Sequence, residues 1–113
     1  MNWYKKASMG NEWTPEELDF LVEASQELNN RASDRIQIDT NEVNSDYIHL
    51  KVTIKNSISG AFEPQQEVYT REMRIEKTQP NWYEVNVDDS GYNSTQSFKI
   101  VSDVVSNFIS EIR

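Results

Sequence analysis

Acidic residues give the N-terminal part of this sequence its clearest chemical character. At about 100° per residue, a group of carboxylates falls within an arc of about 80° on a helix that begins at Pro15. We call this group the acidic stripe, and it consists of Glu16, Asp19, Glu23 and Glu27. Leu21 and Leu28 lie on the far side of the same helix, so we expect the stripe to face solvent.

The spacing within the acidic stripe allows two interpretations. Glu23 and Glu27 are about 6 Å apart along the helix axis, which is comparable to the phosphate spacing of one nucleic-acid strand. Within residues 15–30 no lysine or arginine lies four positions from a stripe residue, so we expect no local neutralisation. The stripe is therefore either a surface that binds a basic partner or an ordinary solvated helix face.

Aromatic residues supply the other candidate contacts. Tyr47 and Trp82 fall on the polar side of predicted strands, and Trp82 should lie beside Tyr47 and Arg74 if the strand register allows. Exposed aromatic side chains next to charges are typical of protein contact surfaces. Two alternatives stay open: the N-terminal tail covers Trp82, or Trp3 and Tyr4 in that tail bind the partner themselves.

The residues that usually perform catalysis are sparse. The sequence has no cysteine, and its single histidine, His49, falls in a predicted strand on the solvent side. No Gly-x-Ser-x-Gly elbow and no glycine-rich phosphate loop can be written. The stretch 86–91 resembles the start of a calcium loop, but Ser97 stands where a bidentate glutamate is needed. We therefore expect no enzyme activity, no metal and no cofactor.

Two amphipathic helices are predicted at the two ends of the chain. The first has Thr14 as N-cap, Pro15 at its first position and Glu17 completing a capping box, and it should end near Arg31 or Ala32. Its expected buried residues are Leu18, Leu21, Ala24 and Leu28. The second helix should be capped by Ser94 or Thr95. Its expected buried residues are Phe98, Val101, Val104, Val105, Phe108, Ile109 and Ile112.

Between the helices the hydrophobic pattern changes to period two and predicts strands. Their expected ranges are 35–39, 47–55, 68–76 and 82–87. We expect a hairpin loop at 40–45, a break at 56–66, and turns at 77–81 and 88–91.

The element order predicts an α+β fold, α-β-β-β-β-α. We expect a four-stranded antiparallel sheet with the N-terminal and C-terminal helices packed on one face. The other face should carry Tyr47, His49, Lys51, Thr70, Glu72, Arg74, Trp82 and Glu84. With 113 residues the chain is expected to form an N-terminal tail, 1–13, and a single domain, 14–113.

Composition narrows the classes of partner. The net charge of −8 disfavours direct contact with nucleic acid, whose phosphates would repel the protein. No run of about 18 apolar residues occurs, and the N-terminus does not resemble a signal peptide, so we expect no membrane contact. The lack of cysteine favours a reducing compartment, and we expect a cytoplasmic protein.

We therefore predict a non-enzymatic acidic protein that binds and inhibits a basic or nucleic-acid-handling protein. Small acidic phage and mobile-element inhibitors act in this way, some of them as nucleic-acid mimics, and the analogy rests on size and charge alone. The alternative is a small acidic homodimeric chaperone for assembly or secretion. A stable dimer with an apolar groove would favour the chaperone, and a monomer that binds one basic protein would favour the inhibitor.

Overall fold

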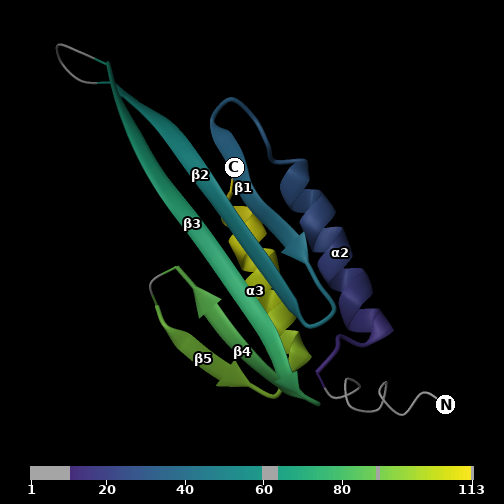
Figure 1. The fold of residues 1–113 in the computed structure, drawn as a ribbon. Coiled ribbons are helices and arrows are strands. Elements are labelled where there is room, and N and C mark those ends of the chain that lie inside the picture. Colours follow the sequence, from purple (N-terminus) through teal and green to yellow (C-terminus); the bar gives the residue numbers. More distant parts are fainter. Residues whose placement is uncertain (1–10, 60–63, 89, 113) are drawn as a thin grey trace.

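The computed structural model describes residues 11–59, 64–88 and 90–112. Within these ranges the chain forms two helices and a five-stranded antiparallel sheet in the order β1-β2-β3-β4-β5 (Figure 1). The elements are α2 (Pro15–Asn29), β1 (Ile36–Val43), β2 (Tyr47–Ser59), β3 (Pro64–Gln79), β4 (Trp82–Val87), β5 (Tyr92–Thr95) and α3 (Phe98–Glu111). The predicted α+β class and the antiparallel sheet are confirmed.

The sheet has a fifth strand that the sequence pattern did not predict. β5 pairs with β4 from Asn86 opposite Tyr92 to Tyr83 opposite Thr95. The chain reverses before it through Asp88 and Gly91, whose φ angles are 53° and 80°. Strand β5 is short and polar, so its main-chain bonds to β4 define it rather than any alternation of apolar residues.

The start of α3 differs from the prediction for the same reason. Ser94 and Thr95, the expected N-caps, belong to β5, and the helix begins at Phe98. Ser97 occupies the N-cap position but makes no side-chain capping bond to the helix. Burial therefore holds this helix in place, and the predicted core residues Val105 and Phe108 are 0% and 2% exposed.

Helix α2 begins as predicted and ends slightly earlier. The Thr14 N–H donates to Glu17 Oε1 at 2.8 Å, and the Glu17 N–H donates to Thr14 Oγ1 at 3.2 Å. These two bonds are both halves of the capping box. The helix ends at Asn29, before the predicted Arg31 or Ala32. Leu18 was predicted to be buried, but it is 37% exposed.

The strands are longer than their apolar patterns indicate. β1 continues to Val43, so most of the predicted loop 40–45 is paired with β2. Strands β2 and β3 continue through most of the predicted break at 56–66, where Asn56 pairs with Glu67 and Ser57 with Gln66. A hairpin ladder can extend on main-chain bonds alone where both of its faces are solvated, and there the apolar alternation is lost.

One hydrophobic cluster unites the helices and the sheet. It contains the predicted inward residues of β2, which are Ile48, Leu50, Val52 and Ile54, together with Met73, Ile75, Tyr83 and Val85 from β3 and β4. Helix α2 contributes Leu21, Ala24 and Leu28. α2 contacts β1 and α3, and α3 contacts β4 and β5, with α3 behind the sheet in Figure 1.

Candidate partner-binding site

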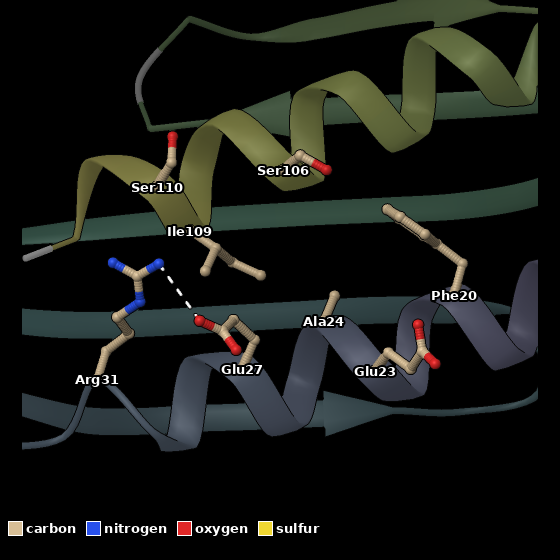
Figure 2. Close-up of a pocket in the computed structure, with 8 residues that line it drawn as sticks. All are labelled: Phe20, Glu23, Ala24, Glu27, Arg31, Ser106, Ile109 and Ser110. Carbon is tan, nitrogen blue, oxygen red and sulfur yellow. Dashed lines mark hydrogen bonds and ion pairs between the residues drawn. The ribbon is translucent and has the colours of Figure 1, made fainter.

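A groove of about 320 Å³ lies between the two helices (Figure 2). Its apolar lining comes from Phe20 and Ala24 on α2 and from Ile109 on α3. Its polar lining consists of Glu23, Glu27, Arg31, Ser106 and Ser110. Figure 2 shows carboxylates along the α2 side and serine hydroxyls along the α3 side. We call this feature the interhelical groove.

The structure divides the acidic stripe into two pairs. All four carboxylates are exposed, as expected. Glu23 and Glu27 line the interhelical groove, whereas Glu16 and Asp19 do not. Half of the acidic stripe therefore lies beside the apolar lining of the groove. On a uniformly solvated helix face, the carboxylates would have no apolar surface next to them.

Arg31 changes the charge balance of the groove. Its Nη2 lies 3.4 Å from Glu27 Oε1 (Figure 2). Its Nη1 donates to the Ile112 carbonyl at 2.9 Å. The expectation that no basic residue neutralises the stripe was wrong, because Arg31 lies just beyond the range 15–30 and reaches back one turn. Arg31 bridges the C-terminal ends of the two helices, and Glu23 keeps no ion pair in the described residues.

Tyr47 lies within a polar network on the sheet. Its hydroxyl donates to Glu42 Oε1 at 2.8 Å, and the Arg74 guanidinium lies 4.9 Å from the centre of its ring. Tyr47 therefore lies beside Arg74, one of the two neighbours that were predicted for Trp82. The bond from Tyr47 is the largest cause that lowers the pKa of Glu42, and the same bond raises the pKa of Tyr47.

Next to this polar network lies a small cavity of about 220 Å³, which is lined by His49, Glu72, Arg74 and Asn86. His49 Nε2 lies 2.6 Å from Glu72 Oε2. The histidine thus has a carboxylate partner that the sequence alone did not reveal. Among the described residues that line this cavity there is no serine, threonine or tyrosine.

Trp82 lies apart from Tyr47 along the sheet. It is half-buried and pairs with Gln79, whereas Tyr47 pairs with Glu76 three positions earlier on β3. The ring contact of Arg74 is with Tyr47 and not with Trp82. The predictions that concern Trp3 and Tyr4 fall outside the described residues.

A buried polar cluster is the main feature that sequence reasoning missed. Lys77 Nζ donates to Glu17 Oε1 at 2.9 Å, and the Tyr83 hydroxyl donates to Glu17 Oε2. Glu17 and Lys77 are only 6% and 4% exposed. Trp13, at the end of the predicted tail, is buried against the cluster and stacks on Tyr83 at 6.0 Å.

Hydrogen bonding decides the charge state of Glu17. Burial by itself would raise the pKa of Glu17, but the bonds from Thr14, Tyr83 and Lys77 outweigh it and lower that pKa. Burial, followed by the bond to Glu17, raises the pKa of Tyr83. The cluster is thus an ionised glutamate held by a protonated tyrosine and a lysine. Both carboxylate oxygens of Glu17 accept hydrogen bonds from within the protein, so we assign the cluster to the stability of the fold.

The described residues contain no group of three histidine or acidic side chains arranged to hold a metal ion. Asp88, from the segment that resembles a calcium loop, accepts from Arg71 and from the Glu72 N–H instead. In the part of the chain that the structure describes, neither helix is long and apolar enough to cross a membrane. Compared with known proteins, the chain matches no protein-family model, no curated protein and no solved structure.

Proposed function

We propose that this protein is a non-enzymatic interaction protein that binds a basic segment of another protein in the interhelical groove. The observation that carries the proposal is the pairing of apolar and acidic surface in one groove. Phe20 and Ile109 offer contact to an apolar side chain, and Glu23 and Glu27 offer carboxylates to flanking lysine or arginine residues. An amphipathic basic helix presents this combination of side chains.

Charge supports the same kind of partner. The net charge of −8 attracts basic proteins over a distance and speeds their encounter. The protein inhibits its partner when the bound segment is the one with which the partner binds nucleic acid. In that case Glu23 and Glu27 occupy the positions of two phosphates. Since the chain has no cysteine, we propose that the encounter takes place in the cytoplasm.

The arrangement of the helices supports a second contact surface. We infer that α2 and α3 cover the same face of the sheet, because their buried residues join one cluster with the inward residues of β2, β3 and β4. The opposite face then carries Tyr47, Arg74 and Trp82. These residues can extend the contact with a large partner beyond the groove.

The charge test compares the two halves of the acidic stripe. Glu23→Gln with Glu27→Gln removes the carboxylates of the groove, and Glu16→Gln with Asp19→Asn removes an equal charge outside it. The probe is a synthetic lysine-rich amphipathic helical peptide, titrated by calorimetry at several salt concentrations. We expect the groove pair to weaken binding about fivefold and to flatten its salt dependence, and the other pair to change little. Equal losses from both pairs would show that net charge alone attracts the peptide.

The second test blocks the groove without changing its charge. Ser106 lines the groove and is exposed, so Ser106→Trp should fill the groove and abolish peptide binding while the fold persists. Asn107→Trp is the matched control, because Asn107 is exposed on α3 and does not line the groove. Full binding by the Ser106→Trp variant would refute the groove as the binding site.

A further inference from the structure

We propose that the free edge of β3, residues 66–70, pairs antiparallel with the same edge of a second copy of this chain. The proposal rests on the hairpin of β2 and β3, not on the interhelical groove, and the two can fail separately. It assigns a homotypic contact to a segment that the groove proposal leaves unused. A dimer joined at this hairpin leaves the groove of each copy open to a basic partner, so it is compatible with the proposed inhibitor as well as with the chaperone alternative.

The ends of β2 and β3 project beyond the rest of the sheet as a two-stranded ribbon (Figure 1). The pairing of β1 with β2 ends where Ile36 lies opposite Ile54, and the pairing of β4 with β3 ends where Val87 lies opposite Met73. We call the part beyond these pairs the arm, and it comprises residues 55–59 and 64–71. An isolated two-stranded ribbon is marginally stable in water, so a third strand would stabilise the arm.

The backbone groups of the arm show which residues are free to pair. The Lys55 N–H donates to the Arg35 carbonyl at 2.8 Å, so Lys55 points its main-chain groups away from β3. Val68 lies opposite Lys55, and its own groups therefore point outward on the far edge. The same alternation points the N–H and C=O groups of Gln66 and Thr70 outward. Along this edge the main-chain groups of Glu72 are already hydrogen-bonded, because its N–H and its C=O both bond to Asp88.

Among the described residues, the free edge has little of the usual protection against pairing. Exposed edges are commonly guarded by charged side chains, above all lysine, by proline within the strand or by a bulge. Residues 65–70 contain no lysine, no proline and no bulge, and Glu67 is their single charged residue. Val68 and Tyr69 are 54% and 40% exposed. Such a segment is suited to binding another strand.

The residue pattern favours self-pairing about a twofold axis at Val68. In that register Val68 faces its own copy, Gln66 faces Thr70 and Glu67 faces Tyr69, so no like charges lie opposite each other. Arg71 faces Gln65, and its guanidinium keeps the ion pairs that it makes with Asp88 and Glu111 of its own chain. The three outward residues of each copy would exchange main-chain hydrogen bonds with the other copy.

Neighbouring registers are excluded by the chain itself. An axis at Gln66 would place Pro64, which has no N–H, opposite Val68. An axis at Thr70 would place Val68 opposite Glu72, whose main-chain groups already bond to Asp88. Sliding one copy by two residues moves the axis by one residue, to Glu67 or to Tyr69. The first axis places Pro64 opposite Thr70 and Glu67 opposite its own copy, and the second places Gln66 opposite Glu72, whose main-chain groups are occupied. Val68 is therefore the axis that leaves all three outward residues able to pair.

The charge distribution allows two acidic chains to meet at the arm. The stretch 55–71 contains Lys55 and Arg71 against Glu63 and Glu67, a net charge of zero in a chain of −8. Salt screens the repulsion between the two chains, so the dimer should strengthen as salt rises. Binding of a basic peptide to the groove should weaken under the same change, which separates the two proposals.

Cysteine cross-linking tests the register directly, because the natural chain has no cysteine. In Val68→Cys the two Cα atoms would be about 5.5 Å apart across the axis, within the range of a disulfide. In the control Thr70→Cys the two new cysteines would be four residues out of register, about 14 Å apart, which is too far. We expect mild oxidation to link Val68→Cys into a dimer and to leave Thr70→Cys monomeric. Linking of neither variant, or of both equally, would overturn the proposal.

A second measurement uses the natural chain and substitutions that remain folded. Hydrogen exchange at the amides of Gln66, Val68 and Thr70 should slow as protein concentration rises, whereas those of Glu67 and Tyr69 already bond to β2 and should not change. Val68→Lys places like charges at the axis and should abolish the dimer in sedimentation, while Val68→Thr keeps it. Concentration-independent exchange at all five amides would also refute the dimer.

Discussion

Two sets of glutamates on the same helix have opposite environments. Glu17 lies in the first turn of α2, is 6% exposed and accepts from Thr14, Lys77 and Tyr83. Glu23 and Glu27 lie two to three turns later, are exposed and line the interhelical groove. Their position around the helix axis, not their residue type, decides which carboxylate stabilises the fold and which is available to a partner. Substitutions in the two sets should therefore differ in their effect on the unfolding free energy.

The largest effect is expected from Lys77→Met. Removing the lysine leaves the buried Glu17 carboxylate without its cation, and breaking a buried ion pair in this way costs about 3–5 kcal/mol. Urea denaturation followed by circular dichroism measures the loss. The double variant with Glu17→Gln serves as control and should recover part of the stability. A loss below 1 kcal/mol for Lys77→Met, the lower limit expected when a buried polar group is left unsatisfied, would show that water reaches this cluster.

A smaller loss is expected from Tyr83→Phe. The change removes one hydrogen bond to a charged acceptor and keeps the ring that stacks on Trp13, so about 1.5–3 kcal/mol should be lost. The folded state raises the pKa of Tyr83 above its ordinary value of 10. This stability is therefore complete below pH 10 and falls as the pH rises beyond it. The Tyr83→Phe variant should lack that alkaline decline, and an identical decline in both proteins would contradict the role of Tyr83.

Acid titration sharpens the comparison between the glutamates. Folding lowers the pKa of Glu17 below its ordinary value of 4.5, so its contribution is present above pH 4.5 and is lost as the pH falls through the lower value. The difference in unfolding free energy between the natural chain and Glu17→Gln should shrink as pH drops. Glu23→Gln, which removes one carboxylate from an exposed position of the same helix, is the control for the change in net charge.

The smallest effect on stability is expected from the triple change Glu16→Gln, Glu23→Gln and Glu27→Gln. These side chains are exposed, so the unfolding free energy should change by no more than about 0.5 kcal/mol, and relief of like-charge repulsion favours a slight gain. Thermal melting measures it. A large loss would mean that the acidic stripe is part of the structural framework, as Glu17 is.

Part of the buried cluster was recognisable before the structure was known. Glu17 stands four positions before Leu21 and seven before Ala24, so helical spacing places it on the apolar face. The capping box already accounted for Glu17, so there was no further reason to expect a buried ion pair at this position. The partner of Glu17 could not be predicted, because Lys77 lies 60 positions away in a stretch that was predicted to be a turn.

The sequence by itself determined the features that depend on neighbouring residues. The start of α2 follows from a capping box within four residues, and the faces of β2, β4 and α3 follow from strict alternation or helical spacing. Only the tertiary structure decided β5, the length of the arm, the union of Glu17 with Lys77 and Tyr83, and the groove between α2 and α3. The physical reason is that main-chain ladders and helix packing join segments far apart in the chain. Hydrophobic periodicity shows which face of a segment is buried, but it does not show which distant segment covers that face.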